Sequence, residues 1–299
     1  MTAIHLTRVS PSTTIQDRGR PGALQYGISA SGPMDRGAFE RALARLGRPS
    51  GEAIEITRAG IAFEVEEGPA ETAFEGGAFS LEVNGALHPW PALLRLGSGD
   101  KVAVTPGPHG NYGYVAFDGV IDVPRVLGSR ATNLVAGIGR SVLQAGDRLS
   151  LRPVVSQAAP VDLPPPASGD GPIRFLWGLH ADLFASEIRQ AFVARHFVIS
   201  TRLDRMGVRL GDPAGVFSVA PSLSLVSDAI VPGDVQILGD GTPIVLMRDH
   251  QPTGGYPRIA TVIAADLDRF AQLRPGTELA FAPVSLHNAR QLYLSSRAR

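Results

Sequence analysis

The sequence predicts a mostly β protein, with two β-barrel subdomains and a few packing helices. Short segments alternate apolar and polar residues, as half-buried strands do, and few segments have helical spacing. The 299 residues include 34 Gly and 24 Pro, close to a fifth of the chain, where roughly 12% is average. A chain this rich in turn residues suits sheets of many short strands.

Strands are predicted where the alternation is clearest. Half-buried strands are expected at residues 53–57, 62–66, 79–83 and 147–151. Residues 243–247 read Pro-Ile-Val-Leu-Met, an unbroken apolar run that suits a strand buried on both faces.

A phrase made of a leucine, a Gly-containing turn and a strand occurs three times. Its copies are residues 96–102, 143–149 and 273–279. Both a common β-turn and a true repeat explain it, and both favour barrel-like sheets in the two halves.

Three helices are predicted from helical spacing of apolar residues, at 35–46, 181–196 and 266–273. The first has the clearest ends. Ser31 or Asp35 can cap its start, and Gly47 is placed to end it.

A proline-rich segment divides the chain. Residues 153–172 contain a triple proline and a Ser-Gly-Asp-Gly run, which resist both sheet and helix. We therefore expect an N-terminal β-rich subdomain at 1–152, a linker at 153–172 and a C-terminal β-barrel subdomain at 173–299.

Composition excludes several chemistries. Without cysteine there is no thiol nucleophile, Cys-ligated zinc or iron–sulfur cluster. The one lysine, Lys101, follows no Gly-rich phosphate loop and is not flanked by methionines, as a biotin-attachment lysine would be. ATP or biotin would therefore be held mainly by another chain.

Charge and hydropathy narrow the partners and the location. The 28 basic and 28 acidic residues balance, which argues against nucleic acid. No apolar run is long enough for a membrane span, and the N-terminus lacks signal-peptide features, so a cytoplasmic location is expected. The seven histidines show no metal-ligand spacing, and no metal site is predicted.

Three polar, Gly-rich segments interrupt the strand pattern. Residues 13–35 include Asp17, Arg18 and Arg20 before a helix start, where free N–H groups can receive an anion. These residues alternatively form structural pairs that brace the loop. Residues 201–210 carry Arg205, and an arginine fork suits a carboxylate or phosphate, although a solvated arginine face on a strand explains it too.

The third segment, 248–258, directly follows the apolar run. Its double glycine, Gly254 and Gly255, lets backbone N–H groups approach a ligand closely. Gln251, Thr253 and Tyr256 offer neutral donors and acceptors. A turn with a packed tyrosine is the alternative.

These segments carry a resemblance to a known family. The motifs are Ile-Gln-Asp-Arg-Gly-Arg-Pro-Gly at 15–22, Ser-Gly-Pro-Met-Asp at 31–35, Glu-Ile-Thr at 55–57, Val-Leu-Gly-Ser-Arg-Ala-Thr at 126–132, Asp-Arg-Met-Gly at 204–207, Val-Pro-Gly-Asp-Val-Gln at 231–236 and Gln-Pro-Thr-Gly-Gly-Tyr-Pro at 251–257. In this order they resemble the biotin-dependent carboxyltransferase-like family, also called allophanate hydrolase subunit 2 or KipA-like.

The resemblance implies a cyclophilin-like β-barrel architecture and a B-type, KipI-like partner protein. It implies one component of an ATP-dependent 5-oxoprolinase, which opens the lactam 5-oxoproline to glutamate, together with a further A-type partner protein. Two alternatives stay open. One is transfer of a carboxyl group from carboxybiotin on a partner to urea or another amide-like acceptor, and the other is a non-enzymatic KipA-like regulator that binds a KipI-like protein.

The candidate site follows from the three segments. We expect Gln251, Thr253, Gly254, Gly255 and Tyr256 to bind the amide-like substrate, with no cofactor attached to this chain. Asp17 and Arg205 are the candidates for polar or proton-handling roles, and Arg18, Arg20 or Arg258 for a carboxylate. The sequence departs from the family pattern at Leu179, Leu203, Asp228 and Pro252, which bears on substrate identity more than on fold.

Overall fold

The chain, seen in a computed structural model, divides into two compact units. The first comprises Met1–Gly22 and Ala30–Pro166, and the second Ala23–Ser29 and Ala167–Arg299. The structure describes residues 2–154, 159–161, 163, 171–218 and 224–297. Most of the expected linker, 153–172, lies outside these residues. The grouping of Ala23–Ser29 with the second unit is not indicated by the sequence.

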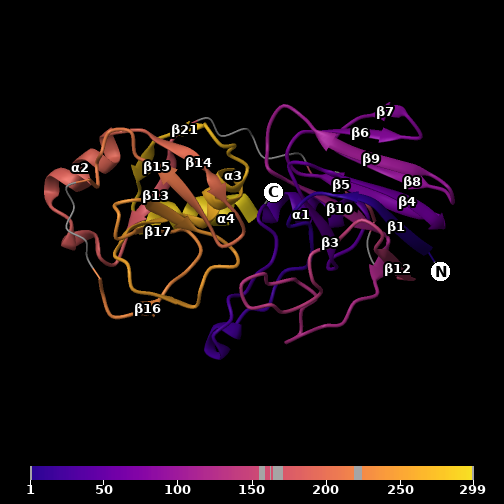
Figure 1. The fold of residues 1–299 in the computed structure, drawn as a ribbon, viewed down its shortest axis with the longest axis horizontal. Coiled ribbons are helices and arrows are strands. Elements are labelled where there is room, and N and C mark those ends of the chain that lie inside the picture. The colour runs from indigo at the N-terminus through magenta and orange to yellow at the C-terminus, as the bar shows by residue number, and fades with distance from the viewer. Residues whose placement is uncertain (1, 155–158, 162, 164–170, 219–223, 298–299) are drawn as a thin grey trace. The chain divides into compact units, whose positions relative to one another are not determined.

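The first unit contains two antiparallel sheets (Figure 1). The seven-stranded sheet consists, in spatial order, of β11 (Gly119–Ile121), β12 (Arg148–Pro153), β1 (Thr2–Val9), β4 (Ile61–Glu67), β9 (Lys101–Pro106), β6 (Phe79–Val83) and β7 (Ala86–His88). The five-stranded sheet consists of β2 (Thr14–Gln16), β3 (Ala53–Thr57), β10 (Tyr112–Phe117), β5 (Ala70–Glu75) and β8 (Ala92–Leu96).

Alternation along the strands builds the core of this unit. In β4, Ile61, Phe63 and Val65 are buried while their neighbours are not, as the period of two requires. They join Ile54 and Phe74 of the other sheet in one hydrophobic cluster. Each such side chain contributes about 1.5–3 kcal/mol on burial, so the two sheets are held face to face.

Helix α1 (Arg36–Arg45) covers β10 and β5. All six residues of β10 are buried, because the core lies on one face and this helix on the other. Asp35 caps the helix by accepting a hydrogen bond from Ala38 N at 2.9 Å. Gly47 follows the helix with a φ of 62°, which glycine adopts without strain. Both predicted ends are confirmed.

The second unit is built on an eight-stranded sheet that nearly closes into a barrel. In order it contains β21 (Glu278–Leu279), β14 (Phe197–Leu203), β15 (Gly207–Gly211), β18 (Pro243–Leu246), β17 (Asp234–Ile237), β20 (Arg258–Val262), β13 (Ile173–Trp177) and β22 (Phe281–Pro283). The edge strands β21 and β22 are separated only by Ala280, so the two edges come round to each other. The apolar run at 243–247 is buried throughout, as predicted.

A two-stranded ribbon accompanies this barrel. It pairs β16 (Asp228–Ala229) with β19 (Thr253–Gly254), with Asp228 opposite Gly254 and Ala229 opposite Thr253.

The helices differ in part from prediction. The segment 181–196 is not one helix: a short 3₁₀ turn, η2 (Ala181–Leu183), precedes α2 (Ser186–Ala194). Phe184 and Ala185 separate them because their ψ angles of 136° and 151° are extended. Helix α3 (Ala264–Ala271) begins two residues earlier than predicted. Helix α4 (Leu286–Arg297) and the 3₁₀ turn η1 (Ala23–Tyr26) are not predicted.

The leucine–turn–strand phrase is a turn in each copy. Gly99, Gly146 and Gly276 have φ angles of 87°, 93° and 86°, which glycine adopts readily. The strands β9, β12 and β21 each begin two residues after the glycine of their copy.

The mostly β prediction, with barrel-like sheets and a few packing helices, is confirmed. None of the helices within the described residues has the length and apolar character needed to cross a membrane.

Candidate functional site

Asp17, in the first unit, holds two loop segments together. One carboxylate oxygen accepts hydrogen bonds from Gly19 N at 2.9 Å and Ser129 Oγ at 2.5 Å. The other accepts from Arg130 N at 2.7 Å. Three donors on one carboxylate fix the motif at 15–22 against the motif at 126–132.

Arg20 is buried beside the same loop. Its guanidinium donates to the carbonyl oxygens of Val126 and Ala131 and to Ser31 Oγ. Arg18 is different, because its side chain is half exposed and lies 3.6 Å from the Glu40 carboxylate. Of these two arginines, Arg18 is the one that a ligand can reach from solvent.

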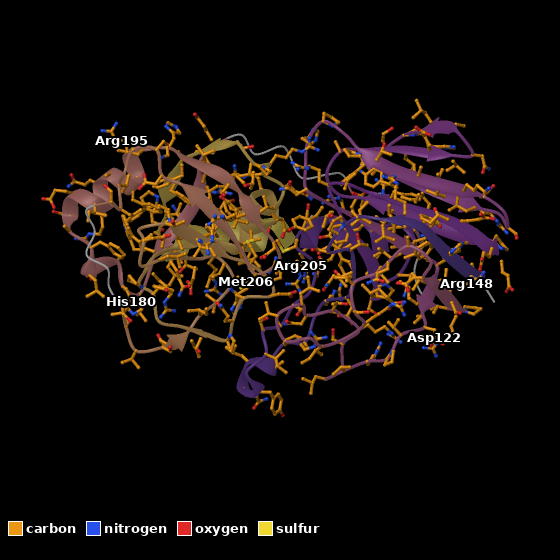
Figure 2. All side chains as sticks on the ribbon, in the orientation of Figure 1. Asp122, Arg148, His180, Arg195, Arg205 and Met206 are labelled. Carbon is orange, nitrogen blue, oxygen red and sulfur yellow. The ribbon has the colours of Figure 1, made fainter. Side chains whose placement is uncertain are left out.

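Arg205, in the second unit, forms a buried two-pronged ion pair. It lies in the turn between β14 and β15 (Figure 2). Its Nε donates to Asp249 at 2.9 Å and its Nη2 to the other oxygen at 3.0 Å. The Arg205 carbonyl also accepts from Asp249 N at 2.7 Å. This pair fixes the residues immediately before Gln251.

The Gln251–Tyr256 segment presents its polar side chains outward. Gln251, Thr253 and Tyr256 are exposed, while its backbone is tied down through the β16–β19 ribbon and a 2.8 Å bond from Leu225 N to Gly255 O. Gly254 packs closely on Gln236, because a Cβ there would lie 2.5 Å from the side-chain atom Gln236 Nε2. A rigid backbone with exposed amide, hydroxyl and phenol groups can bind a neutral carbonyl–nitrogen unit.

Arg258 ends the segment and is shared between two carboxylates. Its Nη2 donates to Asp228 at 2.6 Å, and its Nη1 lies 3.4 Å from Asp234. Nη1 also donates to the Ala229 carbonyl at 2.8 Å. Both terminal nitrogens of Arg258 thus already have oxygen partners.

His180 lies in the loop after β13 (Figure 2). It is hydrogen-bonded to the backbone of Arg258. Its Nδ1 accepts from Arg258 N at 3.3 Å, and its backbone N–H donates to the Arg258 carbonyl at 3.2 Å. A neutral ring that accepts at Nδ1 carries its proton at Nε2. Burial and the Arg258 charge lower the pKa of His180, which favours this neutral form.

His250 has the opposite tautomer. Its Nδ1 lies 2.5 Å from the Gln251 carbonyl, and since a carbonyl only accepts, Nδ1 carries the proton. Burial lowers the pKa of this imidazole, against the opposing effect of its bond to Gln251. The lowered pKa of each imidazole favours its neutral form.

Several residues that contact Arg205 and Arg258 were not singled out from the sequence. Asp249 lies inside the third polar segment, and Asp234 inside the Val-Pro-Gly-Asp motif, but neither pattern indicates an arginine partner. His180 has no signal in the sequence. Among the described residues, no three His, Asp or Glu side chains come together as metal ligands.

Comparison with known protein families gives a match over most of the chain. Residues 26–283 match the family described as carboxyltransferase domain, subdomain A and B. The chain belongs to this carboxyltransferase domain family. The resemblance inferred from the motifs is therefore confirmed.

Relatives of this carboxyltransferase-domain protein include a 5-oxoprolinase component and urea amidolyases. The C component of the Escherichia coli 5-oxoprolinase is 33% identical over 291 residues, 96% of this chain and 93% of that protein. A urea amidolyase of Lachancea kluyveri is 31% identical over 328 residues, covering 99% of this chain and 18% of that longer protein. The solved structure of the K. lactis urea amidolyase superimposes with a TM-score of 0.87 at 28% identity, over 99% of this chain and 19% of that one.

Proposed function

We propose that this chain is one component of an ATP-dependent 5-oxoprolinase that opens 5-oxoproline to glutamate. One observation carries the proposal: the likeness to the C component of the E. coli 5-oxoprolinase spans nearly the full length of both proteins. The urea amidolyase likeness, in contrast, covers less than a fifth of that protein. A cytoplasmic location goes with this proposal.

The exposed groups of Gln251, Thr253 and Tyr256, with the backbone at Gly254 and Gly255, are assigned to the lactam amide. Neutral donors and acceptors on a fixed backbone suit a carbonyl–nitrogen unit whose oxygen gains negative charge during opening. Arg258 is assigned to the substrate carboxylate.

The other predicted site residues receive narrower roles. Arg205 acts through Asp249 as a positioning residue for the Gln251 segment. Arg18, half exposed, stays a candidate for an anion, while Arg20 and Asp17 hold their own loop. Proton handling by Asp17 stays a prediction.

Activation is assigned to partner proteins. The one lysine, Lys101, lies at the exposed start of β9 and follows no phosphate loop, so ATP is expected on the A-type partner or on the B-type, KipI-like partner.

Reconstitution tests the proposal. The chain is combined with its A-type and B-type partner proteins, and glutamate release from 5-oxoproline is followed with and without ATP. We expect release only with ATP and only when all chains are present. Release that is unchanged when this chain is omitted contradicts the proposal.

A second candidate function is carboxyl transfer from biotin on a partner to an amide-like acceptor. The family match and the urea amidolyase likeness over 99% of this chain favour it. This function requires bicarbonate and a biotinylated partner, so activity that is insensitive to avidin contradicts it.

A further inference from the structure

The ion pair between Arg258 and Asp228 joins a buried group to an exposed one. The Arg258 side chain is 9% exposed, whereas that of Asp228 is 52% exposed. The second carboxylate partner, Asp234, is 2% exposed. Asp234 is also held by Thr261 Oγ1 at 2.7 Å and Val231 N at 3.0 Å. Asp228 accepts one further hydrogen bond, from Ala229 N at 2.7 Å, and its side chain is in contact with water. Of the two carboxylates on Arg258, Asp228 is therefore the one that water can replace at the lower cost.

Charge balance favours exchange over addition. Arg258 carries one positive charge and already faces two carboxylates. A third carboxylate beside them would meet net negative charge, which disfavours it. A ligand carboxylate that replaces Asp228 leaves the charge on Arg258 compensated as before, while Asp228 moves into water.

The location of Asp228 connects this exchange to the Gln251–Tyr256 segment. Asp228 lies on β16 opposite Gly254 of β19, and Arg258 follows the same segment two residues after Tyr256. A ligand held by the segment therefore has the Arg258–Asp228 pair within its immediate surroundings.

We propose that Asp228 occupies, in the free protein, the position on Arg258 that the carboxylate of the ligand takes, and that binding displaces it. The identity of that ligand, a lactam with a carboxylate, rests on the proposed function. Asp228 is then a built-in competitor that sets the affinity for carboxylate-bearing ligands. Lactams without a carboxylate do not displace it.

Calorimetry on the full chain, by itself and with its partner proteins, tests this proposal. The probes are 5-oxoproline and 2-pyrrolidone, the same ring without the carboxylate. Asp228→Asn removes the competing charge and keeps the side-chain shape, so 5-oxoproline binds about five-fold more tightly, the upper range for an exposed ion pair. Binding of 2-pyrrolidone stays unchanged.

Asp182→Asn is the matched control, because Asp182 is an exposed aspartate paired with Arg189 at 2.8 Å. It leaves both affinities unchanged. Equal 5-oxoproline binding by wild type and Asp228→Asn, equal gains for both probes, or no binding of 5-oxoproline to either protein overturns the proposal.

The turnover assay keeps this outcome separate from the proposed function. If the wild-type complex releases glutamate but wild type and Asp228→Asn bind 5-oxoproline equally, the exchange is contradicted and the proposed function is not. If Asp228→Asn binds 5-oxoproline more tightly but the wild-type complex shows no turnover, the proposed function is contradicted and the exchange is not.

Discussion

Two buried arginines of the second unit are held in different ways. Arg205 faces the fully buried carboxylate of Asp249 through two hydrogen bonds. Arg258 divides its bonds between an exposed and a buried carboxylate. A two-pronged buried pair is rigid, since releasing either member leaves an uncompensated charge away from water. The first arginine therefore suits positioning, and the second suits exchange with a ligand.

Arg205→Ala measures the positioning role. Removing one member of a buried pair costs about 3–5 kcal/mol, so the urea midpoint of the second unit falls sharply, as reported by Trp177 fluorescence. Glutamate release by the complex falls as well, because the Gln251 segment loses its anchor. Arg189→Ala breaks an exposed pair and costs at most about 1 kcal/mol. Equal stability of the two variants, or full activity of Arg205→Ala, contradicts this role.

Close backbone approach connects the elements around Arg258. The loop after β13 lies so near β20 that a Cβ on Gly178 would sit 2.4 Å from the Arg258 carbonyl oxygen. The same contact aligns His180 with the Arg258 backbone. At Gly254, in contrast, a Cβ would meet the end of the Gln236 side chain at 2.5 Å, which can move. Glycine at position 178 therefore lets the elements around the arginine pack together.

Gly178→Ala tests this packing. The new methyl group meets backbone rather than a movable side chain, so the loop must shift, at a cost of about 1–3 kcal/mol. The loss is measured by urea unfolding, and 5-oxoproline affinity falls because Arg258 shifts with it. Gly97→Ala is the control, since its Cβ would meet only Asp100 Oδ2, at 3.7 Å. Similar stability of the two variants shows that the close approach is not required.

At the scale of the whole molecule, local patterns predicted the strands with the clearest alternation or apolar run, and they predicted fewer of the helix details. The alternation in β4 and β6 and the apolar run in β18 involve residues that are close together in the sequence. These patterns can therefore be recognised from the sequence alone. Helical spacing does not distinguish the η2 turn from α2. Helix α4 escaped prediction because most of its residues are exposed, which weakens an apolar stripe.

The sequence predicted which segments form the candidate site, but it did not predict which of their residues form ion pairs and hydrogen bonds with one another. The Gly-Gly-Tyr segment is evident from its composition. Arg205 and Asp249 are 44 residues apart, and Asp17 and Arg130 are 113 apart, so only folding brings them together. The sequence therefore predicts which residues carry the chemistry, and the structure supplies which of them are already paired.

The second unit carries both histidines whose pKa is lowered, His180 and His250. Burial has the largest effect on the pKa of His250 and lowers it, and the Arg248 charge lowers it further. The bond to Gln251 and the nearby Asp234 and Asp249 raise this pKa but do not reverse the shift. The unfolded chain takes up this proton near the ordinary pKa of 6.5. The stability contributed by the neutral ring is present above that pH and is lost as the pH falls below it.

The two tryptophans report this loss for each unit separately, because Trp90 belongs to the first unit and Trp177 to the second. Between pH 7 and pH 5, the urea midpoint of the Trp90→Phe variant, read from Trp177, should fall. The urea midpoint of His250→Gln in that background should fall less, because glutamine takes up no proton in this pH range. The groups of the first unit whose pKa is shifted, Arg48, Asp100 and Tyr114, ordinarily titrate well outside this pH range. The Trp177→Phe variant, read from Trp90, should therefore change less. Equal acid sensitivity of the two units, or no effect of His250→Gln, contradicts the assignment of acid sensitivity to these buried imidazoles.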